Sequence, residues 1–160
     1  MAANKVVEFE RSYEAPVEKV WQAWTDPNQL KRWWGPDNVT IPECEIDLRI
    51  GGRFYIVMEA TEAMGEYKGT RWPMEAKFTT VEPNSKLVYD AKAWTEGEEE
   101  GTTIETVQEL AFSEENGKTK INLKATLNKV GPKAGMAAEG MKYGYNKQLD
   151  KLDKFLAEQE

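Results

Sequence analysis

The hydrophobic pattern of the chain begins with a strand and then changes to two short helices. In residues 5–14 apolar and polar positions alternate, which is typical of a strand. Its inward face carries Val7, Phe9, Arg11 and Tyr13. Residues 16–25 instead carry apolar side chains three and four positions apart, the period of an amphipathic helix. Asp26 and Pro27 then supply the cap and the first position of a second helix, which runs to about Trp34 and is stopped by Gly35 and Pro36.

The middle of the chain predicts six strands separated by turn signals. The expected strands cover residues 39–50, 53–60, 73–81, 86–94, 102–112 and 119–127. Gly51 and Gly52 indicate a turn between the first two of them. Asn116 followed by Gly117 is the strongest hairpin signal, because a tight type I′ turn needs two residues that tolerate positive φ.

The last part of the chain returns to a helical period. Its apolar stripe consists of Met141, Tyr145, Leu149, Leu152 and Leu156. A helix over residues 137–157 would be about 30 Å long, enough to lie along a whole sheet. Gly135, Gly140 and Gly144 fall in its first half, although a glycine inside a helix costs about 1 kcal/mol relative to alanine. Either these glycines allow close packing on the sheet, or they keep the helix thin so that a cavity remains beneath it.

These elements predict an α+β fold with a single domain over residues 1–160. The order is one strand, two short helices, six strands and one long helix. A seven-stranded antiparallel sheet with one apolar face needs a cover, and only the C-terminal helix is long enough to provide it. We therefore expect a strongly curved sheet wrapped around that helix, with space between them wherever side chains are small.

Composition narrows the possible classes of function. The net charge of −7 argues against a general nucleic-acid binder, because basic side chains are needed to neutralise phosphates. No apolar run approaches the roughly 20 residues of a membrane span, so we expect no membrane insertion. The N-terminus lacks the basic and apolar blocks of a secretory signal. We expect a cytoplasmic monomer.

The chain contains no histidine and one cysteine, Cys44. The missing histidine removes the usual general base near neutral pH, the usual metal ligand and the base of Ser-His or Cys-His pairs. We therefore expect no metal, no cofactor and no catalytic residue, although carboxylates, lysine or tyrosine leave enzymatic activity open. Cys44 itself is expected to be a small buried apolar side chain.

Two acidic clusters have a simple interpretation as solvated surface. Carboxylates alternate along one face of the strand that follows residue 39, at Glu43, Glu45 and Asp47. The opposite face, expected to be buried, carries Cys44, Ile46 and Leu48. The acidic run at residues 96–101 lacks the ligand spacing of a calcium loop, so we expect a solvated loop there.

Three stretches carry a resemblance to a known family. They are "APVEKVWQAWTDPNQLKRWWGP", "DLRIGGRF" and "GMKYGYNKQLDKL". In this order they resemble the activator-of-Hsp90-ATPase homologue family of the START-like (SRPBCC) superfamily, over residues 5–158. The resemblance implies the helix-grip or Bet v 1-like fold, in which the sheet curls around the C-terminal helix and often encloses a deep apolar cavity.

The chain departs from that family in two respects. Tyr145 stands where many relatives have tryptophan, which would put a hydroxyl in the cavity wall. The eukaryotic co-chaperone of the family also carries a separate N-terminal domain, for which we expect no room in 160 residues. The family name is therefore a weak guide to the function of this chain.

We expect a binding protein whose cavity takes a small apolar or amphipathic ligand. The predicted lining is Trp33, Phe54, Ile56, Met58, Phe78, Met141 and Tyr145, with Arg11 as a polar anchor. The guanidinium of Arg11 would suit a carboxylate, unless the side chain simply extends to solvent at a strand end. Trp33 and Trp34 point about 100° apart on a short helix. We favour Trp33 toward the cavity, because Leu30 lies three residues before it.

Two other functions stay open. The chain could contact a chaperone of the Hsp90 class in a stress response, which would require a basic patch on the partner of this acidic domain. It could also be an enzyme resembling the polyketide cyclases or the other aromatic-compound-processing members of the superfamily. That activity would require an Asp or Glu inside the cavity with a raised pKa.

Overall fold

The computed structural model describes residues 5–35 and 38–158, and describes residues 5 and 136–141 by their backbone alone. The elements are β1 (Lys5–Tyr13), α1 (Val17–Thr25), α2 (Pro27–Leu30), β2 (Val39–Ile46), β3 (Arg53–Ala60), η1 (Glu62–Tyr67), β4 (Arg71–Glu82), β5 (Lys86–Ala93), α3 (Glu99–Thr102), β6 (Ile104–Glu115), β7 (Lys118–Val130) and α4 (Gly135–Glu158). The predicted order of one strand, two short helices, six strands and one long helix is confirmed. Two short helical turns, η1 and α3, are added to it.

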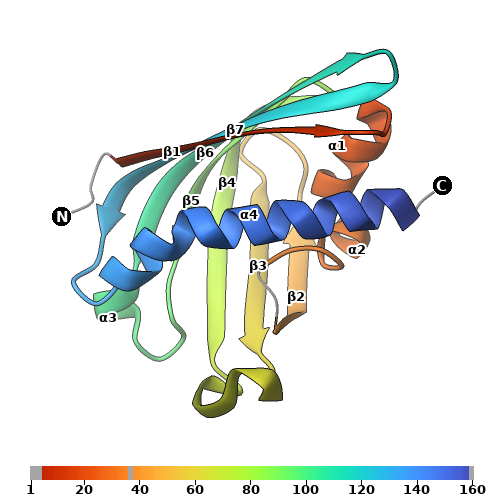
Figure 1. The fold of residues 1–160 in the computed structure, drawn as a ribbon. Helices are drawn as coiled ribbons and strands as arrows, with labels where there is room; N and C mark the ends of the chain where they lie inside the picture. Colours follow the sequence, from red (N-terminus) through yellow and green to blue (C-terminus); the bar gives the residue numbers. More distant parts are fainter. Residues whose placement is uncertain (1–4, 36–37, 159–160) are drawn as a thin grey trace.

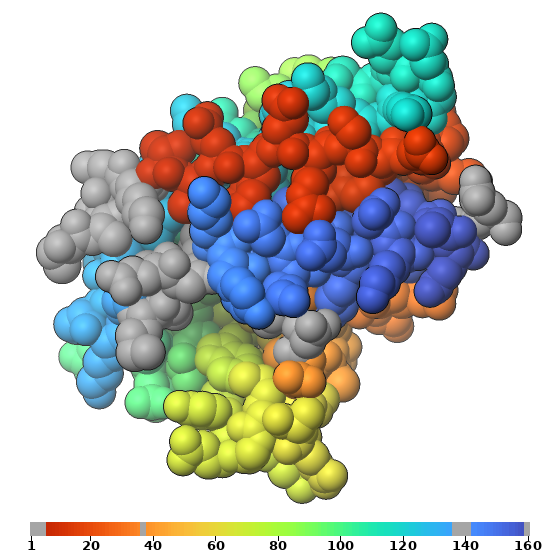
Figure 2. Space-filling model, viewed as in Figure 1, coloured from red at the N-terminus to blue at the C-terminus, as the bar shows by residue number. Residues whose placement is uncertain are grey.

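Within the described residues, seven strands form one antiparallel sheet in the order β1-β7-β6-β5-β4-β3-β2. The sheet curls, and α4 crosses its concave face while α1 and α2 lie at one end (Figure 1). On the face seen in Figure 2, β1 runs directly beside α4. This is the helix-grip fold that the hydrophobic pattern and the family resemblance predicted.

The two predicted turns join the strands as expected. Asn116 and Gly117 connect β6 to β7 with φ angles of 55° and 79°, the pair of positive values that a type I′ turn requires. Gly51 and Gly52 lie in the connection from β2 to β3. A Cβ at Gly52 would come within 2.0 Å of the backbone oxygen of Asp47, so this turn requires glycine.

The predicted apolar stripe of α4 is confirmed from Tyr145 to Leu156. Its buried apolar side chains are Tyr145, Leu149, Leu152, Phe155 and Leu156. The side chain of Met141 lies outside the described part of the chain. One residue on this face was not expected to be there, because Gln148 is polar and yet only 5% exposed.

Two details of the sequence analysis are corrected. Leu48 was placed on a buried strand face, but β2 ends at Ile46, and Leu48 lies beyond it with 37% of its surface exposed. The acidic run was expected to be a loop. Its glutamates are exposed, but Glu99–Thr102 form the helical turn α3. Among the described helices, none is long and apolar enough to cross a membrane.

Candidate functional site

A cavity of about 470 Å³ lies between the sheet and the first half of α4. Strands β3 to β6 supply one side of its wall, with Ile56, Met58, Met74 and Ile104 among the apolar contributors. Four further lining side chains, Met64, Trp72, Trp94 and Lys133, are partly or fully exposed. They lie around the start of β4 and the end of β5, and we call this end of the cavity its mouth.

Small side chains on both sides keep the cavity open. Ala91 and Ala93 of β5 face Gly144 of α4 across it. Among the described residues, no atom lies within 4 Å of the position that a Cβ on Gly144 would take. Close packing on the sheet therefore does not explain Gly144, whose absent side chain leaves space. The side-chain position of Gly140 lies outside the described part.

Thr106 and Gln108 of β6 lie in the cavity wall and are joined by a hydrogen bond, and a second bond links Gln108 to Tyr89 of β5. The hydroxyl of Tyr89 donates to Oε1 of Gln108 at 2.8 Å, and Nε2 of Gln108 donates to Oγ1 of Thr106 at 3.3 Å. Burial raises the pKa of Tyr89 well above its ordinary value, and it raises the pKa of Tyr145 as well. Both phenols are therefore neutral hydrogen-bond donors at physiological pH.

Gln148 connects α4 to the end of the double-tryptophan segment. Its Oε1 accepts a hydrogen bond from the backbone N–H of Gly35 at 2.9 Å. Three residues along the helix, Nζ of Lys151 donates to the carbonyl oxygens of Gly35 at 3.2 Å and Trp34 at 3.4 Å. These contacts hold Trp34, whose side chain is 5% exposed, in the wall of the cavity.

Trp34, and not Trp33, lines the cavity, so our preference between the two is corrected. Trp33 is fully buried on the other side, where its Nε1 donates to the carbonyl oxygen of Ala23 at 3.1 Å. Its ring meets Trp24 edge to face, with 4.8 Å between the ring centroids. Leu30 does share the face of Trp33, as predicted, but that face packs into the core beneath α1.

The other predicted lining residues divide between the cavity and the core. Ile56, Met58 and Tyr145 line the cavity, whereas the side chain of Met141 is not described. Phe54 and Phe78 are not in the lining, because they stack on each other with 5.8 Å between their centroids and fill the end of the concave face next to Trp34.

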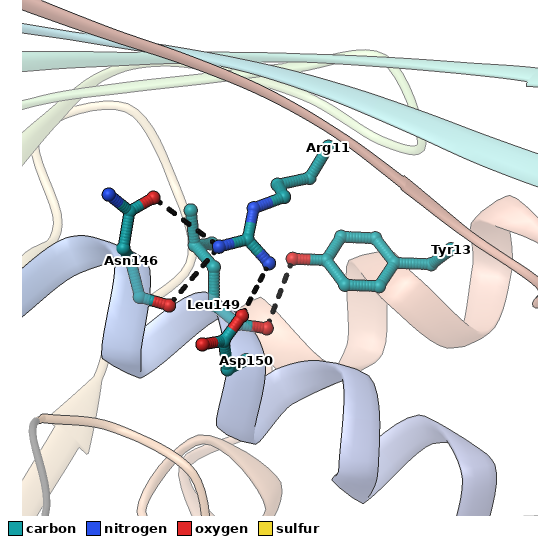
Figure 3. Close-up of polar contacts among 5 residues, drawn as sticks. All are labelled: Arg11, Tyr13, Asn146, Leu149 and Asp150. Carbon is teal, nitrogen blue, oxygen red and sulfur yellow. Dashed lines mark hydrogen bonds and ion pairs between the residues drawn. The ribbon is translucent and has the colours of Figure 1, made fainter.

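Arg11 lies on the concave side of β1, as its position predicted, but it contacts α4 and not the cavity (Figure 3). Its Nη1 pairs with Oδ1 of Asp150 at 2.8 Å, and its Nη2 donates to the backbone oxygen and Oδ1 of Asn146 at 3.2 and 3.3 Å. The nearby hydroxyl of Tyr13 donates to the carbonyl oxygen of Leu149 at 3.4 Å. The predicted role of Arg11 as a polar anchor inside the cavity is corrected to a link between β1 and α4.

The carboxylates of β2 face solvent, as expected. Glu43 pairs with Arg71 at 2.6 Å, and Glu45 pairs with Arg53 at 3.0 Å. Burial raises the pKa of the half-buried Cys44 thiol to about 11. No Asp or Glu is found among the described residues that line the cavity.

Sequence reasoning missed Gln148 as a lining residue, although a signal for it was present. Position 148 lies three residues after Tyr145 and four after Gly144, so it belongs to the same helical stripe. A polar residue on an otherwise apolar stripe marks a buried polar group that needs a partner. We overlooked Gln148 because we considered only the methionine and the tyrosine of this stripe as lining residues.

The chain matches a known family, and its fold is shared with several solved structures. The family model described as "Activator of Hsp90 ATPase homolog 1-like protein" matches residues 14–157. A protein from Rhodobacter sphaeroides is similar with 23% identity and a TM-score of 0.76, covering 99% of this chain and 96% of its own. A protein from Arthrobacter aurescens is similar with 24% identity and a TM-score of 0.77, covering 97% and 87%.

A third similar structure is the AHSA1 protein from Silicibacter pomeroyi, with 21% identity and a TM-score of 0.76, covering 97% of this chain and 99% of its own. At these identities the solved structures show the shared fold. No curated protein matches the chain. The family match spans most of the sequence and agrees with the curled sheet and long helix. The chain therefore belongs to the activator of Hsp90 ATPase homolog 1-like family, with the helix-grip fold of the START-like superfamily.

Proposed function

We propose that this protein binds a small apolar or amphipathic molecule in the cavity beneath α4. The observation that carries the proposal is the cavity itself, about 470 Å³ in volume and walled largely by Ile, Met, Trp and Ala side chains. Small-molecule sites in proteins are of this size and character, with a few polar groups among apolar ones.

The mouth suits an amphipathic ligand. Trp72 and Trp94 offer flat apolar surfaces there, and the exposed Lys133 offers a cation at the edge. A ligand could bury its apolar part between β5 and α4 and leave a polar or anionic group in water beside Lys133. At about −0.3 kcal/mol per non-hydrogen atom, a ligand of about 20 such atoms would bind with about −6 kcal/mol. This corresponds to a Kd of roughly tens of micromolar.

The test is an NMR titration of protein labelled at its methionine methyl groups. Lauric acid, the flavone quercetin and 2-naphthoic acid serve as probes at concentrations up to about 1 mM, well above the expected Kd. We expect saturable shifts of Met58, Met64 and Met74, whose side chains line the cavity. No shift of these signals with any probe, or shifts confined to residues outside the cavity, would contradict the proposal.

A cavity-filling variant with a matched control makes the test specific. Gly144→Leu adds a side chain that fills the open space, so it should abolish the shifts. The helix should still form, because leucine is a good helix former. Tyr143→Leu introduces the same residue at the neighbouring position, where the side chain is 67% exposed, and should leave binding unchanged. Equal effects of the two variants would mean that the probes bind elsewhere.

The description of the family names activation of the Hsp90 ATPase, and this is the alternative function that the same experiment can recognise. A purified chaperone of the Hsp90 class replaces the small molecules in a second titration. Surface shifts with the chaperone, combined with no cavity shifts with any probe, would replace ligand binding by chaperone interaction. Since the chain carries a net charge of −7, such an interaction should weaken as salt is added.

A further inference from the structure

Gln148 presents an unused hydrogen-bond donor in the wall of the cavity. The residue is only 5% exposed, and it lines the cavity from α4 beside Gly144 and Tyr145. Among the described residues, its Nε2 has no hydrogen-bond partner. A buried amide N–H without a partner is unfavourable, so an acceptor supplied to it by a ligand would be bound preferentially.

The orientation of this amide is determined by its other end. Oε1 of Gln148 accepts from the backbone N–H of Gly35 at 2.9 Å. The reversed amide would place its NH₂ group against that N–H, so that two donors would face each other. Nε2 must therefore point away from Gly35, and the donor is held in place before any ligand arrives.

No polar group of the described cavity wall satisfies this donor. The side chain of Gln108 bonds instead to Tyr89 at 2.8 Å and to Thr106 at 3.3 Å. An apolar ligand leaves this donor unpaired, whereas a ligand with an acceptor at this point supplies the missing bond.

We propose that Gln148 selects ligands that carry a neutral carbonyl oxygen on a flat aromatic framework. This inference rests on the proposed function and specifies its ligand. A carbonyl fits better than a carboxylate, because the described inner wall offers neutral donors and no cation to offset the desolvation of a charge. The indole of Trp34 and the methionines of β3 and β4 provide the apolar contacts for the aromatic rings.

The test compares fluorenone with fluorene, two rigid tricyclic compounds that differ by one carbonyl oxygen. The ratio of the two Kd values is measured in the wild type and in Gln148→Met, which keeps the length of the side chain but has no N–H. We expect the preference for fluorenone to fall by about tenfold in the variant, the size of one buried hydrogen bond. Gln108→Met is the control, since its oxygen and one of its N–H groups are already hydrogen-bonded within the protein, and it should alter both Kd values alike.

A second measurement needs no variant that could fail to fold. In ¹⁵N-labelled wild-type protein, fluorenone should move the side-chain amide protons of Gln148 downfield, and fluorene should not. The inference is overturned if both compounds bind with the same ratio in wild type and Gln148→Met, or if Gln108→Met alone removes the preference. In those cases the proposed binding function survives. If neither compound shifts any cavity resonance, this inference fails, and the proposed function is then decided by the titrations with lauric acid, quercetin and 2-naphthoic acid.

Discussion

Replacing Gly144 by alanine should make the protein more stable. The residue lies inside α4 and is not among the described residues with positive φ, so alanine can adopt its backbone conformation without strain. A Cβ at this position meets no described atom within 4 Å. The substitution then acts through helix propensity alone, which favours alanine by about 1 kcal/mol. For a domain of this size, that gain corresponds to a rise in Tm of about 2–4 °C.

Urea denaturation followed by tryptophan fluorescence measures the effect. The midpoint should rise in Gly144→Ala while the slope of the transition stays the same, because the surface exposed on unfolding hardly changes. Gly52→Ala is the opposing control, since its Cβ would come within 2.0 Å of the Asp47 carbonyl and the free energy of unfolding should fall. A loss of stability in Gly144→Ala would refute our reasoning, because it would mean that α4 packs against the sheet at this point and leaves no space there.

Three further predictions concern Arg11, Cys44 and the two adjacent tryptophans. Arg11→Met removes a partly exposed ion pair and should lower the free energy of unfolding by at most about 1 kcal/mol, without changing the Kd for fluorenone in the same titration. The Cys44 thiolate, followed by absorbance at 240 nm, should form with a midpoint near pH 11. Because burial raises the pKa of this thiol, the unfolded chain loses its proton first, and the free energy of unfolding should decrease from about pH 9 to 11 in urea titrations. Trp33→Phe should mainly lower the free energy of unfolding, since it removes the hydrogen bond to Ala23. Trp34→Phe should mainly weaken ligand binding, since Trp34 lines the cavity. Scanning calorimetry measures the first effect and titration calorimetry the second.

Local rules were sufficient for most of the fold. The alternation in β1, the Asn116-Gly117 turn and the stripe of α4 each depend on residues close together in the sequence, and each formed as predicted. The predicted burial of Leu48 was wrong, because the alternation of apolar and polar residues does not show where a strand ends. The preceding β2 stops at Ile46, where the chain turns toward Gly52.

The site depended on contacts between distant segments, which no local pattern encodes. Phe54 and Ile56 share one face of β3, yet only Ile56 lines the cavity, because Phe78 and Trp34 pack around Phe54. In the same way, the angle between Trp33 and Trp34 showed that they must diverge. It could not show which of the two packs against α1 and which lines the cavity.

The two halves of α4 have different surroundings. This explains why glycines occur in the helix before Gln148 and leucines occur after it. Beyond that residue, Leu149, Leu152 and Phe155 are buried in the core. Before it, Gly144 contributes no side chain, and Ala91 and Ala93 are among the residues of the sheet that line the cavity. Gln148 stands at the boundary and joins the helix to Gly35, next to the one tryptophan of the pair that faces the cavity. The second large aromatic of the pair is therefore part of the cavity wall, and the amide that holds it there is the one whose Nε2 has no partner among the described residues.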